Sequence, residues 1–87
     1  MSDTTDTHKT SLLIVEDNDD FRNFLINCLK GTYQVFDAPN GKEALEILAH
    51  QSIQIVISDV MMPEMDGMEL CRKIKTDIRY SHIPVIL

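Results

Sequence analysis

The chain has 87 residues, of which 44% are hydrophobic and 25% are charged, so it suits one small globular domain and is too hydrophobic for a disordered chain. Its 14 acidic and 8 basic residues give a net charge of -6, which argues against non-specific binding to nucleic acid or to an anionic membrane. No apolar stretch is long enough to cross a bilayer. We expect a cytoplasmic domain whose two cysteines, Cys28 and Cys71, are reduced and buried as small hydrophobic residues.

The first predicted elements follow a polar stretch, residues 1–10, which we expect to be a disordered tail. The run "SLLIVE", residues 11–16, is continuously apolar up to its last residue, which is typical of a strand buried on both faces. A helix is predicted next, because apolar residues recur at helical spacing: Phe21, Phe24, Leu25, Cys28 and Leu29.

The same alternation continues to the end of the sequence. "TYQVFDA" (32–38), "IQIVIS" (53–58) and "IPVIL" (83–87) are predicted strands. "PNGKEALEILAH" (39–50) and "MELCRKIKTD" (68–77) are predicted helices, whose inward residues are Ala44, Leu45 and Leu48 in one and Leu70, Cys71 and Ile74 in the other. Apolar strands that alternate with amphipathic helices predict an α/β domain with a parallel sheet covered on both faces.

Acidic residues stand where two of these strands end. Glu16 and Asp17 follow the first strand, and Asp59 follows the third. If the two strands are neighbours, they lie about 4.8 Å apart, and the three carboxylates converge. Such crowding favours a hard divalent cation, of which Mg²⁺ is the first choice inside a cell. Asp59 alone would be interpreted as a solvated loop residue, but the three acids together indicate a site.

A central aspartate beside a metal site has a known chemistry. A carboxylate can attack phosphorus and form an acyl phosphate, and a bound Mg²⁺ assists by neutralising the phosphoryl oxygens. This is the chemistry that the strand-end Asp59 suggests.

The stretches "LLIVEDN", "ISDVMMPEMDGMELCRKIK" and "IPVIL" resemble the receiver domain of two-component response regulators, over residues 11–87. The final stretch, "CRKIKTDIRYSHIPVIL", looks most like receivers of hybrid two-component proteins. The resemblance implies a flavodoxin-like, doubly wound parallel sheet with strand order 2-1-3-4.

The resemblance also implies roles for particular residues. Asp59 would accept a phosphoryl group from a phosphohistidine on a histidine kinase or a phosphotransfer domain. The implied Mg²⁺ ligands are the carboxylates of Asp17 and Asp59, Glu16 through water, and the backbone carbonyl of Met61. Pro63 and Gly67 would shape the loop that leads into the third helix.

The sequence also departs from the family. The family's fifth strand and last two helices are not in it, nor are the hydroxyl residue beyond the fourth strand and the lysine beyond the fifth, so we expect a truncated receiver. The segment 83–87 would then be an apolar sheet edge, which predicts self-association through this strand.

Two other functions stay open. One is a Mg²⁺-dependent phosphohydrolase with an aspartyl nucleophile, although Met61 stands where such an enzyme would want a second acid. The other is a binding module that keeps the receiver fold without being phosphorylated.

Overall fold

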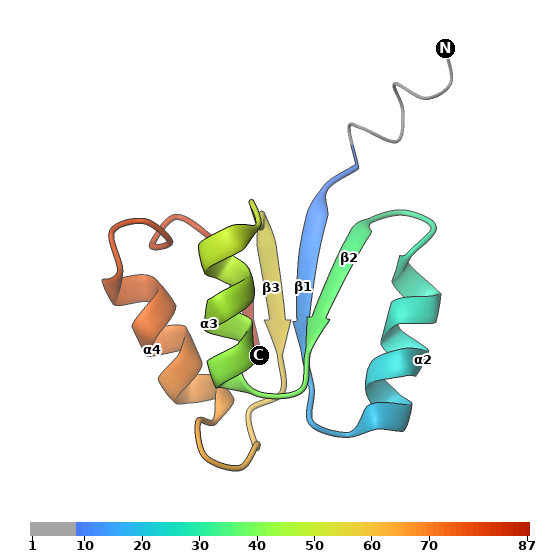
Figure 1. The fold of residues 1–87 in the computed structure, drawn as a ribbon, viewed down its shortest axis with the longest axis horizontal. Coiled ribbons are helices and arrows are strands. Elements are labelled where there is room, and N and C mark those ends of the chain that lie inside the picture. Colours follow the sequence, from blue (N-terminus) through green and yellow to red (C-terminus); the bar gives the residue numbers. More distant parts are fainter. Residues whose placement is uncertain (1–8) are drawn as a thin grey trace.

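Strands and helices alternate along residues 9–87, the part of the chain that this computed structural model describes (Figure 1). The predicted disordered tail, residues 1–10, lies outside the described residues except for its last two positions. The elements in chain order are β1 (Ser11–Val15), α2 (Asp19–Leu29), β2 (Gln34–Ala38), α3 (Gly41–His50), β3 (Ile55–Ser58), α4 (Gly67–Thr76) and β4 (Val85–Ile86).

The four strands form one parallel sheet with the order β2-β1-β3-β4, as predicted. β1 is hydrogen-bonded on both sides, to β2 and to β3, and all five of its residues are buried. This explains why its sequence is continuously apolar and does not alternate. The fold is the flavodoxin-like, doubly wound arrangement that the resemblance to receiver domains implied.

The main core lies between the sheet and the two helices α3 and α4. Leu13 and Val56 from the sheet pack with Leu48, Leu70 and Ile74 from these helices, and all five are buried. Burial of an aliphatic side chain contributes about 1.5–3 kcal/mol, so this layer is the main source of stability.

Helix α2 departs from the prediction of a buried stripe. None of its residues is buried, and Phe21 and Phe24 are 49% and 59% exposed, with their rings stacked 6.2 Å apart. Cys28 is exposed and Cys71 is only half-buried, so the prediction that both cysteines are buried is wrong. The reason for Cys28 is that, within residues 9–87, α2 packs chiefly on β1 and β2 while its outer side faces solvent.

The last strand is shorter than predicted. Strand geometry covers Val85–Ile86 rather than residues 83–87, because Ile83 still belongs to a turn and donates its N–H to the Tyr80 carbonyl at 2.9 Å. Pro84 has no N–H to add to the ladder. β4 pairs with β3 on one side, and no strand of the described chain pairs with its other side.

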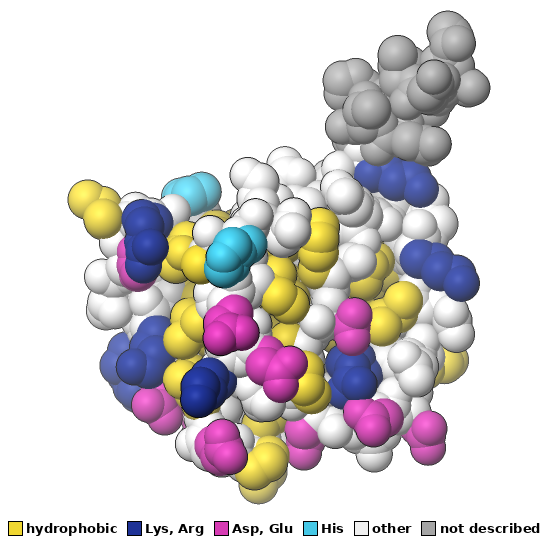
Figure 2. All heavy atoms as spheres, viewed as in Figure 1, with side chains coloured by type: hydrophobic (Ala, Val, Ile, Leu, Met, Phe, Trp, Pro, Cys, Tyr) yellow, Lys and Arg dark blue, Asp and Glu magenta, His cyan; other side chains and the backbone are white. Residues whose placement is uncertain are grey.

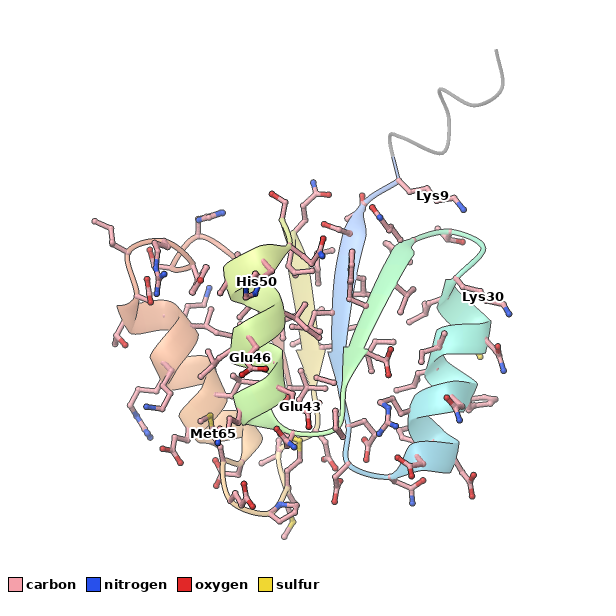
Figure 3. The ribbon with its side chains drawn as sticks, in the orientation of Figure 1. Lys9, Lys30, Glu43, Glu46, His50 and Met65 are labelled. Atoms are coloured by element: carbon pink, nitrogen blue, oxygen red, sulfur yellow. The ribbon has the colours of Figure 1, made fainter. Side chains whose placement is uncertain are left out.

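Each of the helices α3 and α4 begins with a glycine. Met65, in the loop before α4, lies beside the first turn of α3 (Figure 3), and a Cβ atom on Gly41 would stand 2.8 Å from its sulfur. This contact packs the loop before α4 against the start of α3, close to the carboxyl ends of the strands. No helix within residues 9–87 has the length and apolar composition needed to cross a membrane.

Candidate functional site

The strand ends bring three carboxylates together. Val15 and Ser58 are paired in the parallel ladder between β1 and β3, and the N–H of Asp59 donates to the Val15 carbonyl at 3.0 Å. The acids that follow therefore leave the sheet side by side. One carboxylate oxygen from each of Glu16, Asp17 and Asp59 lies within 4.8 Å of the others, which is the convergence that the sequence predicted.

Other acidic side chains lie toward the same end of the molecule. Figure 2 shows them on the lower half of the face it presents, toward the carboxyl ends of the strands, with lysine and arginine side chains among them. In the described part of the chain, no second group of three potential metal ligands comes as close together.

Glu16 is the most enclosed of the three acids, with 6% of its surface exposed. Its carboxylate accepts a hydrogen bond from the N–H of Asn18 at 3.1 Å, and its own N–H donates to the Ala38 carbonyl at 3.1 Å. Burial raises the pKa of Glu16, the Asn18 hydrogen bond opposes this rise, and the negative charges of Asp59 and Asp17 add to it. The pocket thus disfavours charge on Glu16 unless a cation is present.

Asp59 is half-buried and Asp17 is exposed, so the site opens to solvent. The N–H of Met61 approaches the Asp59 carboxylate at 3.4 Å, which is a long contact. The side chain of Met61 is 81% exposed and points away from the core, in contrast to the buried Met62. The role of the Met61 carbonyl as a metal ligand stays a prediction.

The loop after Asp59 is tied to the start of α4. The N–H of Gly67 donates to the Val60 carbonyl at 2.8 Å, and a Cβ atom on Gly67 would stand 2.9 Å from the Val60 Cα and closer still to the Asp59 carbonyl oxygen. Only glycine permits this approach. Asp66 then caps α4 by accepting from the Glu69 N–H at 2.9 Å.

Two further features complete the loop. Pro63 lies exposed in it, and Glu64 adopts a left-handed conformation with φ 67°. The loop-shaping role of Gly67 has a clear steric basis, whereas that of Pro63 stays a prediction.

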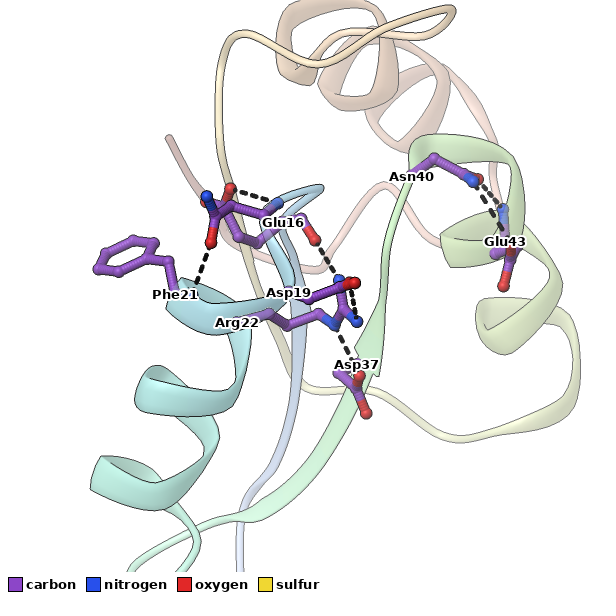
Figure 4. Close-up of polar contacts among 8 residues, drawn as sticks. Glu16, Asp19, Phe21, Arg22, Asp37, Asn40 and Glu43 are labelled. Carbon is purple, nitrogen blue, oxygen red and sulfur yellow. Dashed lines mark hydrogen bonds and ion pairs between the residues drawn. The ribbon is translucent and has the colours of Figure 1, made fainter.

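Arg22 is a residue near the site that sequence reasoning missed. The structure brings its guanidinium to the Glu16 backbone carbonyl at 2.8 Å (Figure 4). Its spacing from Asp19 signals an ion pair within the helix, but nothing in the sequence indicates a contact with the end of β1.

The donor set fits a hard cation. Three carboxylates supply oxygen atoms only, which is the preference of Mg²⁺ and Ca²⁺, and they need a positive charge to offset their mutual repulsion. The arrangement combines an acidic pocket whose oxygen donors suit a hard cation with the half-buried carboxylate of Asp59.

Comparison with known proteins agrees with this arrangement. The family described as "Response regulator receiver domain" matches residues 12–87. Histidine kinase P4 of Formosa agariphila is 51% identical over 83 residues, which are 95% of this chain and 6% of that protein. Chemotaxis protein CheY1 of Helicobacter pylori (strain 26695) is 38% identical over 79 residues, 87% of this chain and 64% of that one. This chain therefore spans less than two thirds of either relative.

Solved structures show the same fold. The signal receiver domain of a signal transduction histidine kinase from Syntrophus aciditrophicus superposes with a TM-score of 0.83 and 42% identity, covering 87% of this chain and 58% of that one. CheY4 of Vibrio cholerae superposes with a TM-score of 0.83 and 29% identity, over 88% of this chain and 65% of that one. The chain belongs to the response regulator receiver domain family.

Proposed function

We propose that this chain is a phosphoacceptor, in which the Asp59 carboxylate takes a phosphoryl group from a phosphohistidine on a histidine kinase or a phosphotransfer domain. The observation that carries the proposal is the convergence of Glu16, Asp17 and Asp59, with one oxygen from each inside 4.8 Å. Membership of the receiver family supports the same assignment.

Asp59 suits the acceptor role by position. Its exposure is intermediate: Glu16 is buried and Asp17 is exposed, whereas Asp59 is half-buried. A partner protein can therefore reach the Asp59 carboxylate from solvent. A carboxylate oxygen of Asp59 would attack phosphorus, the bond from phosphorus to the histidine nitrogen would break, and an acyl phosphate would form.

Mg²⁺ is the proposed cofactor. Asp17 and Asp59 would bind it through their carboxylates, Glu16 through water, and Met61 through its backbone carbonyl. When bound, the ion supplies positive charge against the phosphoryl oxygens. Glu16 fits an indirect role because its carboxylate is already engaged by the Asn18 N–H.

Intact-protein mass spectrometry tests the proposal. The chain is incubated with acetyl phosphate, with Mg²⁺ or with EDTA, and one phosphoryl adduct is expected only with Mg²⁺. Asp59→Asn should abolish the adduct, while the control Asp20→Asn removes an exposed acid from the first turn of α2 and should keep it. An adduct on Asp59→Asn, or none on the unaltered chain, refutes the assignment.

The same experiment separates the rival functions. A phosphohydrolase would release phosphate over many turnovers, and Met61 stands where its second acid would be. A binding module without phosphorylation would give neither adduct nor turnover. The presence of all three acids favours phosphoryl chemistry over a binding module without phosphorylation.

We also propose that two copies associate through β4. Its free edge carries backbone groups that no described strand pairs, and Ile86 within this strand is exposed. Light scattering at rising concentration should show dimers, and Ile86→Lys should reduce them. A monodisperse monomer at high concentration would contradict this. We place the chain in the cytoplasm, where its two free cysteines would stay reduced.

A further inference from the structure

Arg22 joins three separate parts of the fold. Its Nη1 donates to the Glu16 backbone carbonyl at 2.8 Å, its Nη2 to the Asp19 carboxylate at 2.7 Å, and its Nε to the Asp37 carboxylate at 3.0 Å (Figure 4). The side chain is 13% exposed, far less than an ordinary surface arginine. One planar group thus holds the end of β1, the first turn of α2 and the strand β2 in fixed relation.

The contact with Glu16 matters most for the acidic pocket. The Glu16 carbonyl belongs to the peptide that joins Glu16 to Asp17, so holding it sets the orientation of that peptide plane. With the N–H of Glu16 bonded to the Ala38 carbonyl and its carboxylate to the Asn18 N–H, Arg22 fixes the remaining polar group of this residue. The direction in which both acids leave the strand depends on these three bonds.

We propose that Arg22 is a positioning residue for the proposed metal site, on which this inference rests. Its guanidinium holds the Glu16–Asp17 peptide in the orientation that lets both acids reach Asp59. The affinity for a cation thus depends on a side chain that never contacts the cation. Partners that orient metal ligands commonly affect metal affinity by tenfold or more.

Electrostatics alone predicts the opposite effect. Arg22 brings a positive charge to the Glu16 carbonyl at the edge of the acidic pocket, so its removal would strengthen the binding of a cation if charge were all that mattered. Loss of positioning would weaken binding. The sign of the change therefore separates the two effects.

The test is a Mg²⁺ titration by isothermal calorimetry on the whole chain and on Arg22→Gln and Arg22→Lys. We expect the dissociation constant to rise on the order of tenfold in both variants. Glutamine has only two N–H donors, and the single ammonium nitrogen of lysine cannot reach three acceptors that are held by three different guanidinium nitrogens. Arg22→Lys keeps the positive charge, so a higher dissociation constant in this variant cannot come from a change of charge. This variant also provides the test if Arg22→Gln does not fold.

The control is Arg79→Gln. Arg79 also forms an ion pair, with Asp77 at 2.8 Å, but it lies in the connection between α4 and β4, at the opposite end of the strands from the acids (Figure 1). Its removal should leave Mg²⁺ affinity unchanged. As a readout without metal, hydrogen exchange at the Asn18 N–H should speed up in the Arg22 variants and not in the control.

The outcomes are distinct. If the unaltered chain binds Mg²⁺ and both Arg22 variants bind it as tightly or more tightly, the positioning role is overturned while the metal site stands. If the unaltered chain binds no Mg²⁺, the proposed metal site is overturned and this inference with it.

Discussion

Gly41 and Gly67 occupy equivalent positions in two helices. Each is the first residue of a ten-residue helix, and each follows a cap, Asn40 or Asp66, whose side chain accepts a hydrogen bond from the third helical residue. Replacement by alanine changes helix propensity and the entropy of the unfolded chain by similar amounts at both positions. The difference between the two variants thus reports what the added methyl group meets.

The structure predicts a large difference. A Cβ atom at Gly41 meets the side chain of Met65, 2.8 Å from sulfur, and a methionine can change rotamer at little cost. A Cβ atom at Gly67 meets main chain, 2.9 Å from the Val60 Cα and 3.0 Å from the Asp59 carbonyl carbon. Overpacking that moves main chain costs about 1–3 kcal/mol, so we expect Gly67→Ala to lose about 2 kcal/mol more than Gly41→Ala.

Urea unfolding followed by circular dichroism at 222 nm measures both variants against the unaltered chain. The m values should agree, which would show that the same surface is exposed on unfolding and that the midpoints report stability. Equal losses in the two variants, or a greater loss at Gly41, would refute the steric argument. Because the displaced atoms belong to Asp59, Gly67→Ala should also weaken Mg²⁺ binding, and Gly41→Ala should not.

Three further predictions concern charge, exposure and capping. Burial raises the pKa of Glu16 above its usual 4.5, so in protein without metal the favourable contribution of this carboxyl is complete below the unfolded pKa and is lost as pH rises through the folded pKa. Glu16→Gln, whose side chain stays neutral, should therefore raise the free energy of unfolding at pH 7 in EDTA, and an unchanged pH profile would contradict this. Phe24→Ser should change the free energy of unfolding by less than about 1 kcal/mol, because Phe24 is 59% exposed. Leu70→Ala should cost about 2–5 kcal/mol, because Leu70 is buried in the core. Urea midpoints compare the two variants, and similar losses of stability would contradict the exposure of Phe24. Asp66→Ala should cost about 1 kcal/mol through loss of the α4 cap, and an unshifted thermal midpoint would count against it.

The sequence predicted the sheet and the meeting of the acids because both follow from local pattern and simple topology. β1 was recognisable as a buried strand because its five residues are all apolar or small. Parallel neighbours end at the same edge, so the acids after β1 and β3 had to converge once the strands were adjacent. Strand and helix boundaries agreed within two residues, and only β4 lost residues at both ends, because a turn replaces the first part of the predicted strand.

Other features depend on contacts that no local pattern encodes. The apolar spacing of α2 identifies a helical face but not whether another element covers it, and Phe21 and Phe24 are exposed because nothing in residues 9–87 packs over them. Arg22 contacts Asp37, which is 15 positions away on another strand. An arginine on a helix has many such partners to choose from, and only the folded arrangement selects one.

The central place of β1 has a consequence for the order in which the chain can form its native structure. Ser11, at the start of β1, bonds Gln54, 43 positions later, just before the strand that completes its second side. During translation, β1 must therefore wait for β3 before both its edges are satisfied. Pairings of such long range are slow to form, so one edge of this apolar strand stays unpaired until β3 has left the ribosome.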